Sequence, residues 1–226
     1  RKFLEIDHTS LDGESLKYYK DLERDFIDAG HNLDEKEKIS LIEIEKRLID
    51  LEIGFSKNIA DDKSEVIFDH SELYGLSQGE LNNLKKEGDK FVVTMAYPDV
   101  NAVMENCKIR ESREKVWKAF NNRAINENSP ILEEAILLRN KKAKLFGFKT
   151  WAEYRLQHRM AKSPKNVDDM YSNLIPKLQE SATKEKTGLV IDQIEVSDIN
   201  PWDIRYFITN KRNSQSNVDC NEIKKY

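Results

Sequence analysis

Apolar residues recur at intervals of three and four along most of the chain, as they do on one face of an α-helix. The first series lies between Asp12 and Gly30 and predicts an amphipathic helix that ends at a glycine cap. A second helix is predicted to begin at Asp34, which can form a capping box with Glu37. The apolar positions of the two helices are Leu16, Tyr19, Leu22 and Phe26, then Leu41, Ile44, Leu48, Leu51 and Phe55.

The apolar stripe of the second helix favours a core-facing position in a helix bundle. A free-standing coiled coil is the alternative, but the stripe extends over only about two heptads, which is short for one. We therefore expect the stripe to be buried against other parts of the chain.

The pattern changes between residues 65 and 100. Two short runs, 66–68 and 91–95, are rich in β-branched and aromatic residues, and they flank a polar stretch that contains Gly75, Gly79 and Gly88. They are predicted to pair as strands around a short helix near residues 78–86. The second run should end at Tyr97 and Pro98, because proline has no N–H for a strand ladder. The sequence thus predicts a small β-ribbon.

Helical spacing returns in residues 111–126 and 130–146, with Pro130 expected in the first turn of the latter. Gly147 should end that helix, and residues 151–160 predict another. Ser163 and Pro164 are typical of a helix start, and this helix should run to about Ser181 with a kink or break at Pro176. A polar linker is expected at 184–197 and a last helix from Pro201. The fold class is therefore mainly α with a small β-ribbon.

Composition supports a folded chain without a strongly charged partner. Of the 226 residues, 38% are hydrophobic and 35% charged, and the 3 Trp, 8 Tyr and 9 Phe argue against disorder. The net charge is −4 with both signs mixed along the chain, so no basic surface for nucleic acid or an anionic membrane is predicted. There is no apolar run long enough to span a membrane and no signal peptide, which favours a soluble, intracellular protein.

Candidate chemistry is sparse. Cys107 and Cys220 are far apart and form no CxxC pair, which favours a reducing compartment over a disulfide framework. The histidines are isolated, and none has a second histidine four positions on, the arrangement that grips zinc on a helix. We expect them to be surface or core-edge residues; they are His8, His31, His70 and His158. The adjacent Glu133 and Glu134 suit a helix start. No catalytic motif is present.

One stretch nevertheless has an order of residues that a generic amphipathic helix would not show. Residues 116–164 read VWKAFNNRAINENSPILEEAILLRNKKAKLFGFKTWAEYRLQHRMAKSP. This stretch resembles the thimet oligopeptidase, neurolysin and saccharolysin family of zinc metallopeptidases. Further collinear resemblances are LIDLEIGFSKNI at 48–59, ELYGL at 72–76, VTMAYP at 93–98, RESREKVWKAFNNR at 110–123 and PWDIRYF at 201–207.

The resemblance implies the helical half of such an enzyme, which forms one wall of a deep channel for short, unfolded peptides. Residues 1–105 would comprise N-terminal helices and the β-ribbon, and residues 106–226 the helical opening part of the peptidase region. The family's zinc site, an HExxH helix with a further glutamate, lies after the WDxxYY element. No catalytic, cofactor-binding or metal-binding residue therefore maps onto this chain, although the full-length family member binds zinc.

The ends of the chain suggest an internal or truncated piece. Arg1 is not an initiator methionine, and the last residues, NEIKKY, resemble the beginning of the family's EIKEYFP. The resemblance therefore implies a segment that is inactive alone, with short peptides and the missing catalytic half of the same chain as partners. The cytosol is the expected location, with the mitochondrion as an alternative.

The residues that match family motifs are expected to have structural roles. Trp202, Asp203 and Tyr206 should pack the two halves together, and the segments 147–154 and 159–162 should likewise be structural. If the opposite wall is missing, some apolar faces should be uncovered. The alternative function is a non-catalytic helical protein, derived from the peptidase, that holds peptides or a partner.

Overall fold

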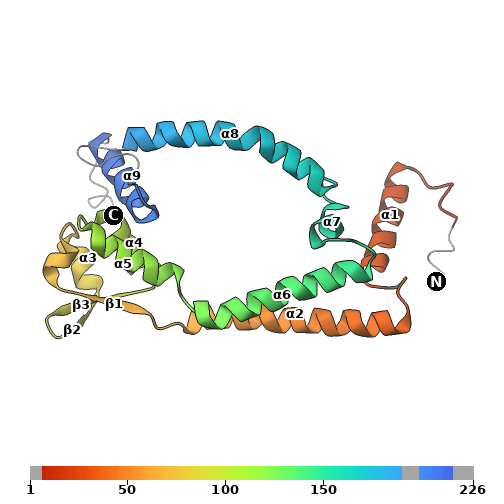
Figure 1. Ribbon diagram of the computed structural model, residues 1–226, viewed down its shortest axis with the longest axis horizontal. Coiled ribbons are helices and arrows are strands. Elements are labelled where there is room, and N and C mark those ends of the chain that lie inside the picture. The colour runs from red at the N-terminus through yellow and green to blue at the C-terminus, as the bar shows by residue number, and fades with distance from the viewer. Residues whose placement is uncertain (1–6, 190–198, 216–226) are drawn as a thin grey trace. The chain divides into compact units, whose positions relative to one another are not determined.

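The computed structural model describes residues 7–189 and 199–215, and these are mainly helical with one small antiparallel sheet (Figure 1). The predicted fold class is confirmed. The chain divides into two compact units. Unit 1 comprises Arg1–Lys57 and Glu127–Asp168, and unit 2 comprises Asn58–Asn126 and Asp169–Tyr226. None of the described helices combines the length and the apolar character needed to cross a membrane.

Unit 1 begins with two helices whose ends follow the sequence signals. Helix α1 (Gly13–Asp28) is capped by Asp12, whose carboxylate accepts the N–H of Ser15 at 2.8 Å, and the chain leaves the helix through Gly30 at φ +82°. Helix α2 (Glu35–Asp61) begins with the predicted capping box. The Asp34 N–H donates to Glu37 at 3.0 Å, and the Glu37 N–H donates back to Asp34 at 2.8 Å.

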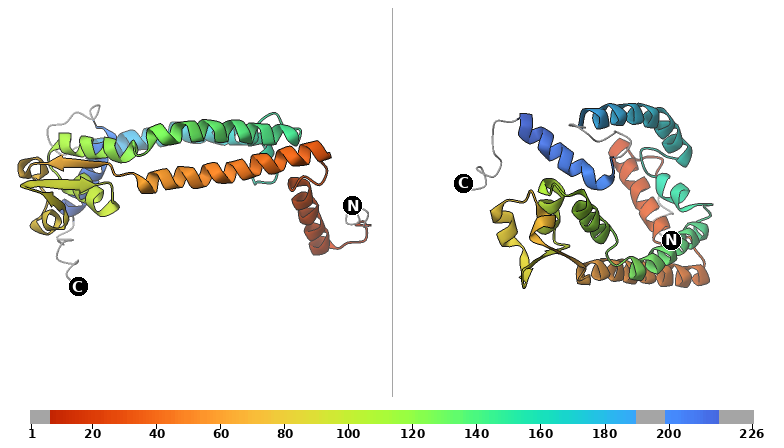
Figure 2. Two further views of the ribbon diagram at one scale, coloured as in Figure 1. Left: turned by 90° about the horizontal axis from the view of Figure 1, so that it is seen from below. Right: turned by 60° about the vertical axis from the view of Figure 1, so that its left-hand side comes forward.

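Helix α6 (Ile125–Leu145) lies antiparallel beside α2 in both orientations (Figures 1 and 2). The predicted stripe of α2 is buried at Leu41, Ile44 and Leu51. At the edge of the pair, the Arg47 guanidinium binds both carboxylate oxygens of Glu134 at 2.7 Å. The stripe therefore faces a second helix of the same unit, as a bundle requires.

Unit 1 ends with a short aromatic cluster around α7 (Trp151–Leu156). Gly147 ends the preceding helix at φ +79°, as predicted, and Thr150 caps α7 in a capping box with Glu153. The helix stops four residues before the predicted end at Met160. Tyr154 stacks on Phe146 with 5.1 Å between ring centroids, which closes the turn onto α6.

The sheet of unit 2 has the order β1-β3-β2, with antiparallel pairing throughout. β1 (Glu65–Phe68) pairs with β3 (Lys90–Thr94), which confirms the predicted ribbon. β2 (Lys85–Glu87) was not predicted, and the helix expected to reach Lys86, α3 (Gln78–Asn83), is shorter. A two-residue turn joins β2 to β3, and Gly88 at its first position has φ +61°, which a glycine adopts without strain.

Three helices of unit 2 pack against one another: α4 (Tyr97–Asn106), α5 (Arg110–Asn121) and α9 (Pro201–Gln215). Of these, α4 and α5 also pack against the sheet. Helix α9 begins at Pro201 as predicted. Helix α4 was not predicted, because Pro98 was taken to end the strand, whereas it also starts a helix. A 3₁₀ turn (His70–Leu73) precedes α3. The core joins the sheet to these helices through Phe68, Leu73, Phe91, Val93, Val103, Cys107 and Val116.

The helix predicted over 111–126 ends at Asn121, and the prediction for Pro130 was also wrong. Ala124 takes φ +50°, and its N–H donates to the carboxylate of Asp62 at 2.8 Å, which holds a reversal between α5 and α6. Helix α6 therefore begins at Ile125, and Pro130 lies inside it rather than in its first turn.

Helix α8 (Pro164–Leu189) is longer than predicted and is not interrupted at Pro176. The predicted start is confirmed, because Ser163 accepts the N–H of Asn166 at 3.3 Å. The helix replaces the first part of the expected linker. The rest of that linker, Cys220 and the final residues 221–226 lie outside the described residues.

Apolar side chains are exposed along single faces of two long helices. On α8 they occur at intervals of one, three and four residues, which places them on one face. The exposed residues are Ile39, Ile42, Ile49 and Ile53 of α2, and Met170, Tyr171, Leu174, Ile175 and Leu178 of α8. These stripes therefore leave apolar side chains of both helices exposed to solvent.

Candidate functional site

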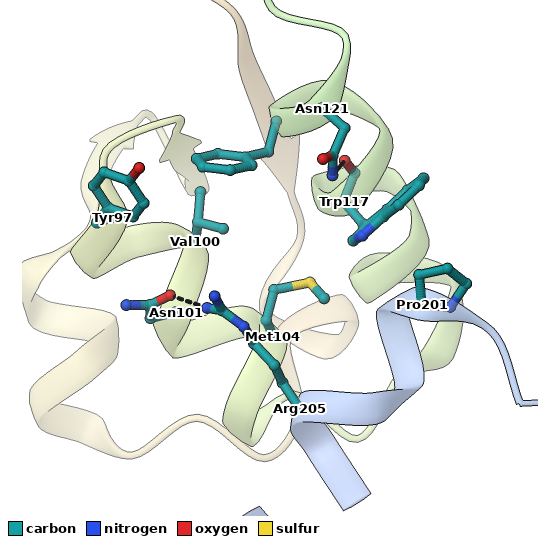
Figure 3. Close-up of a pocket in the computed structure, with 9 residues that line it drawn as sticks. Tyr97, Val100, Asn101, Met104, Trp117, Asn121, Pro201 and Arg205 are labelled. Carbon is teal, nitrogen blue, oxygen red and sulfur yellow. Dashed lines mark hydrogen bonds between the residues drawn. The ribbon is translucent and has the colours of Figure 1, made fainter. Parts of the chain in front are cut away.

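Helices α4, α5 and α9 of unit 2 enclose a pocket of about 150 Å³ (Figure 3). Six apolar or aromatic residues and three polar residues line it. They are Tyr97, Val100, Met104, Trp117, Phe120 and Pro201, with Asn101, Asn121 and Arg205. Pockets that are largely apolar with a few polar groups are the usual places where small ligands bind.

Helical spacing brings these residues together. The lining positions are 97, 100, 101 and 104 of α4, 117, 120 and 121 of α5, and 201 and 205 of α9. Intervals of three and four place each set on one face of its helix. Tyr97 and Phe120 meet edge to face across the pocket, with 5.6 Å between ring centroids. Arg205 donates a hydrogen bond to the side-chain oxygen of Asn101, which links α9 to α4 (Figure 3).

Beside the pocket, a buried carboxylate ties α9 to α5. Asp203 is fully buried and accepts hydrogen bonds from two guanidinium groups. Arg110 donates from Nη2 at 2.8 Å, and Arg113 donates from Nη2 at 2.7 Å. Asp203 also accepts the N–H of Asn200 at 3.1 Å, three residues earlier, so it caps the helix to which it belongs.

Arg113 is almost as buried as its partner, with 2% of its side chain exposed. It also donates to the carbonyl oxygens of Cys107 at 2.8 Å and Trp202 at 3.2 Å. Its guanidinium lies 4.3 Å from the ring centre of Tyr206, close enough for a cation–π contact. The arginine thus connects the end of α4 to the first turns of α9.

These contacts decide the charge state of Asp203. Burial alone would raise the pKa of Asp203, but the hydrogen bonds from Arg110 and Arg113 and from the Asn200 N–H outweigh it, and the pKa lies below its ordinary value. A carboxylate that is ionised and already saturated with donors does not accept a proton from a substrate. Asp203 is therefore suited to hold α9 in place rather than to act as a general base.

Unit 1 contains a second hollow, of about 270 Å³, between α1 and α7. It is lined by Arg24, Asp28, Tyr154, Arg155, His158 and Arg159. Burial, followed by the charge of Asp28 and the hydrogen bond to it, raises the pKa of Tyr154 to about 12. Its hydroxyl lies 3.3 Å from Asp28 and donates to it. Tyr154 therefore stays protonated at neutral pH and is no proton acceptor.

The described residues do not fit a zinc site. A zinc ion needs three or four converging nitrogen, sulfur or oxygen ligands. In residues 7–189 and 199–215, no group of three histidine, cysteine, aspartate or glutamate side chains could hold a metal. Three of the histidines lie against aromatic rings instead: His8 on Tyr19, His31 on Phe26 and His70 on Phe91.

The structure brings together some of the motif residues and separates others. Trp202, Asp203 and Tyr206 all contact the buried arginine of α5. Residues 147–154 form the aromatic turn of unit 1. Residues 159–162 follow α7, where Met160 is fully exposed. Sequence reasoning missed Arg110 and Arg113. Their only signal was a pair of arginines three apart on a helix that also carries Trp117.

Comparison with known proteins gives the family. The sequence model of peptidase family M3 matches residues 103–226. The chain is 34% identical over 180 residues to a thimet-like oligopeptidase of Dictyostelium discoideum, an alignment that covers 78% of this chain and 27% of that protein. It is 28% identical over 235 residues to saccharolysin of Saccharomyces cerevisiae, covering 96% of this chain and 33% of the relative.

Oligopeptidase A of Escherichia coli is 27% identical over 222 residues, which cover 90% of this chain and 33% of the relative. The chain thus spans about a third or less of the length of these curated relatives. The resemblance inferred from the motifs is confirmed by a family match that extends over more than half of the sequence. The chain belongs to peptidase family M3.

Proposed function

We propose that this chain forms the helical scaffold and part of the substrate-channel wall of a zinc-dependent oligopeptidase, which hydrolyses internal bonds of short peptides. The observation that carries the proposal is the alignment of up to 96% of the chain with proteins named as oligopeptidases. The proposed location is the cytosol, with the mitochondrion as the alternative.

In this proposal, the zinc ligands and the residue that activates water belong to the parent enzyme and not to the described residues. The support is chemical. Asp203 is saturated by arginines, Tyr154 is held protonated, and the described histidines do not converge with other ligands. In this proposal, Asp203 and Tyr154 hold other groups in place, and the proton transfers belong to the catalytic part of the enzyme. The partners are short peptides and the catalytic part of the enzyme.

The exposed stripe of α8 supports the role as a wall. Its five apolar residues lie on one helical face and are 40% to 54% exposed. A continuous apolar stripe along a long helix suits the alternating side chains of an extended peptide, or the apolar face of another helix. Folded proteins present few such side chains, because theirs are buried.

The catalytic part of the proposal is tested with the purified 226-residue chain. The chain is incubated with zinc and an internally quenched oligopeptide, with and without a chelator such as o-phenanthroline, and its zinc content is measured by elemental analysis. We expect no chelator-sensitive cleavage and no stoichiometric zinc. Chelator-sensitive turnover would place the chemistry within this chain and overturn its assignment as scaffold.

The wall is tested by photo-crosslinking. An oligopeptide of about ten residues that carries a benzophenone side chain is irradiated with the chain, and the labelled positions are mapped by mass spectrometry. We expect label on the α8 stripe and a loss of label in Leu174→Glu, whereas Ser181→Glu, in the polar part of the same helix, serves as the matched control. If the α8 stripe is not labelled, or if its labelling is unchanged in Leu174→Glu, the proposal that α8 forms part of the channel wall is refuted.

The alternative of a non-catalytic binding protein is an outcome of the same measurements. Sequencing the transcript beyond the codon for Tyr226 separates the two readings. An open frame that continues to an HExxH motif supports the oligopeptidase, whereas a stop codon together with peptide labelling supports the binding protein.

A further inference from the structure

The α4/α5/α9 pocket combines an apolar interior with one cationic group. Tyr97, Trp117 and Phe120 supply aromatic walls, and Met104 supplies an adaptable thioether. Figure 3 shows the Arg205 side chain extending from α9 to Asn101 of α4, at the side of the same hollow that Val100 and Trp117 border. Arg205 and Asn101 thus form a polar side of the hollow, whereas Asn121 lies beside Trp117 on α5, across the hollow from them.

The three arginines near the pocket differ in what they contact. Arg110 and Arg113 both donate to the buried carboxylate of Asp203. Arg205 is exposed, and the polar partner that the described residues give it is the neutral carboxamide of Asn101. A carboxamide does not neutralise a guanidinium. The pocket therefore keeps a positive charge with planar donor geometry, and that geometry matches a carboxylate.

We propose that this pocket binds a carboxylate attached to a small apolar or aromatic body. The ring lies against the side chains of Trp117 and Phe120, and the carboxylate accepts hydrogen bonds from Arg205. A volume of about 150 Å³ holds one six-membered ring. A cationic ligand would be repelled by the guanidinium, and a neutral amide would lose the charge-assisted hydrogen bond.

Two sources offer this chemistry: a free aryl or alkyl carboxylic acid, and the C-terminal residue of a peptide. The proposal goes beyond the proposed function. It concerns a non-catalytic site of unit 2, and it stands or falls without any measurement of peptide hydrolysis.

The test is ligand-detected NMR on the full 226-residue chain, with phenylacetate, phenylacetamide and phenethylamine as matched probes. Saturation-transfer titrations give each dissociation constant, and we expect phenylacetate to bind in the range of about 1 mM, as befits so small a ligand. It should bind about 10-fold more tightly than phenylacetamide, with phenethylamine weaker still. Equal affinities for the three probes would refute the role of the guanidinium.

Two variants keep the test independent of folding. Arg205→Gln should lower the affinity for phenylacetate about 10-fold and leave that for phenylacetamide unchanged. Asn121→Trp, at an exposed lining position, should obstruct the pocket and weaken all three probes. Arg139→Gln, an exposed arginine on α6, is the control for the loss of one charge. Circular dichroism confirms that each variant is folded.

N-acetylphenylalanine and its amide distinguish the two sources. Binding of the acid but not of the amide identifies a peptide C-terminus as a ligand, whereas binding of phenylacetate alone identifies a free acid. Failure of both acids to bind at about 10 mM overturns the proposal. So does an Arg205→Gln chain that binds phenylacetate as well as the unaltered protein.

Discussion

The buried carboxylate of Asp203 should be one of the largest single contributions to the stability of unit 2. Replacing Asp203 by alanine removes the acceptor for Arg110 and Arg113. Arg110 can turn to water, since about a third of its side chain is exposed. Arg113 cannot, because only 2% of it is exposed, so its charge would remain buried without a partner.

Two independent estimates of the loss agree. Removing one partner of a buried ion pair typically costs about 3–5 kcal/mol. Counting one hydrogen bond from each arginine to an ionised acceptor, at about 1.5–3 kcal/mol each, gives about 3–6 kcal/mol. We therefore expect Asp203→Ala to lower the free energy of unfolding of unit 2 by about 3–5 kcal/mol. This is a large fraction of the stability of an ordinary domain.

The chain contains a matched control for this argument. Arg47 and Glu134 of unit 1 form a bidentate pair at 2.7 Å, as short as the contact between Arg113 and Asp203, but 50% and 40% of their side chains are exposed. Water and salt replace such a pair when it is broken. Glu134→Ala should therefore change stability far less than Asp203→Ala, although the geometry of the lost contact is as good.

The assay is urea unfolding followed by far-UV circular dichroism, which reports the helices of both units, and by tryptophan fluorescence in a Trp151→Phe background, in which both remaining tryptophans belong to unit 2. The double variant Asp203→Leu with Arg113→Met should lose less unfolding free energy than the sum of the losses in Asp203→Leu and in Arg113→Met alone. In the double variant neither the aspartate nor this arginine remains as a buried charge without its partner. The reasoning is refuted if Asp203→Ala unfolds at the same urea concentration as Glu134→Ala, or if the two single losses add.

The same carboxylate predicts a loss of stability in acid. The pKa of Asp203 is lower in the folded chain than its ordinary value of 3.8, so the unfolded chain takes up the proton first as the pH falls. Its contribution is complete above pH 3.8 and disappears as the pH drops through the folded-state pKa. Asp203→Asn should flatten this part of the curve of unfolding free energy against pH, relative to the unaltered chain.

Three further predictions concern other parts of the chain. Because the pKa of Tyr154 rises to about 12, its contribution to stability should be lost between about pH 10 and pH 12, and Tyr154→Phe should remove this loss in alkaline urea titrations. A Cβ at Gly75, where φ is +112°, would lie 2.4 Å from a backbone oxygen, so Gly75→Ala should lower the melting temperature much more than Gly88→Ala, which meets nothing within 4 Å. In a Cys220→Ser chain, the buried thiol of Cys107, whose pKa is raised by burial, should react with a thiol reagent only as the protein unfolds.

The parts of the fold that followed from the sequence are those set by nearby residues. The capping box at Asp34 and the glycine ends at Gly30 and Gly147 involve residues within four positions of each other. Such signals can be recognised in one sequence because partner and position appear together. The same holds for the apolar stripe of α2, whose periodicity is a property of the helix alone.

The missed features depend on distant partners or on weak local patterns. The break between α5 and α6 needs the carboxylate of Asp62, 62 positions before Ala124. The charged strand β2 shows no alternation of apolar and polar residues, and it is a strand because it pairs with β3. The hairpin signal in its sequence was the Gly88–Asp89 dipeptide. Helix α4 was obscured because Pro98 serves both as a strand end and as a helix start.

The candidate site shows the same division within one motif. The run 201–207 could be recognised in the sequence, and with it Trp202, Asp203 and Tyr206, but the meaning of Asp203 depends on Arg113, 90 positions earlier. Without that partner, an aspartate beside two aromatic residues could equally be a base in a cleft. Burial and two guanidinium donors make Asp203 a carboxylate that docks α9 rather than a base in a cleft. Neither its burial nor its donors can be predicted from the spacing of residues in the sequence.

The position of Asp203 also couples the start of α9 to the pocket. The Oδ2 atom of the carboxylate accepts both the Asn200 N–H, which caps its own helix, and Nη2 of Arg110 on α5, so the same group caps the first turn of α9 and docks it. That turn carries Pro201 and is followed by Arg205, which closes the pocket against α4. A ligand held by Arg205 must therefore stabilise the docked helix by as much as docking improves its binding, because coupling between two equilibria is reciprocal. The buried aspartate thus acts on the pocket without touching what the pocket holds.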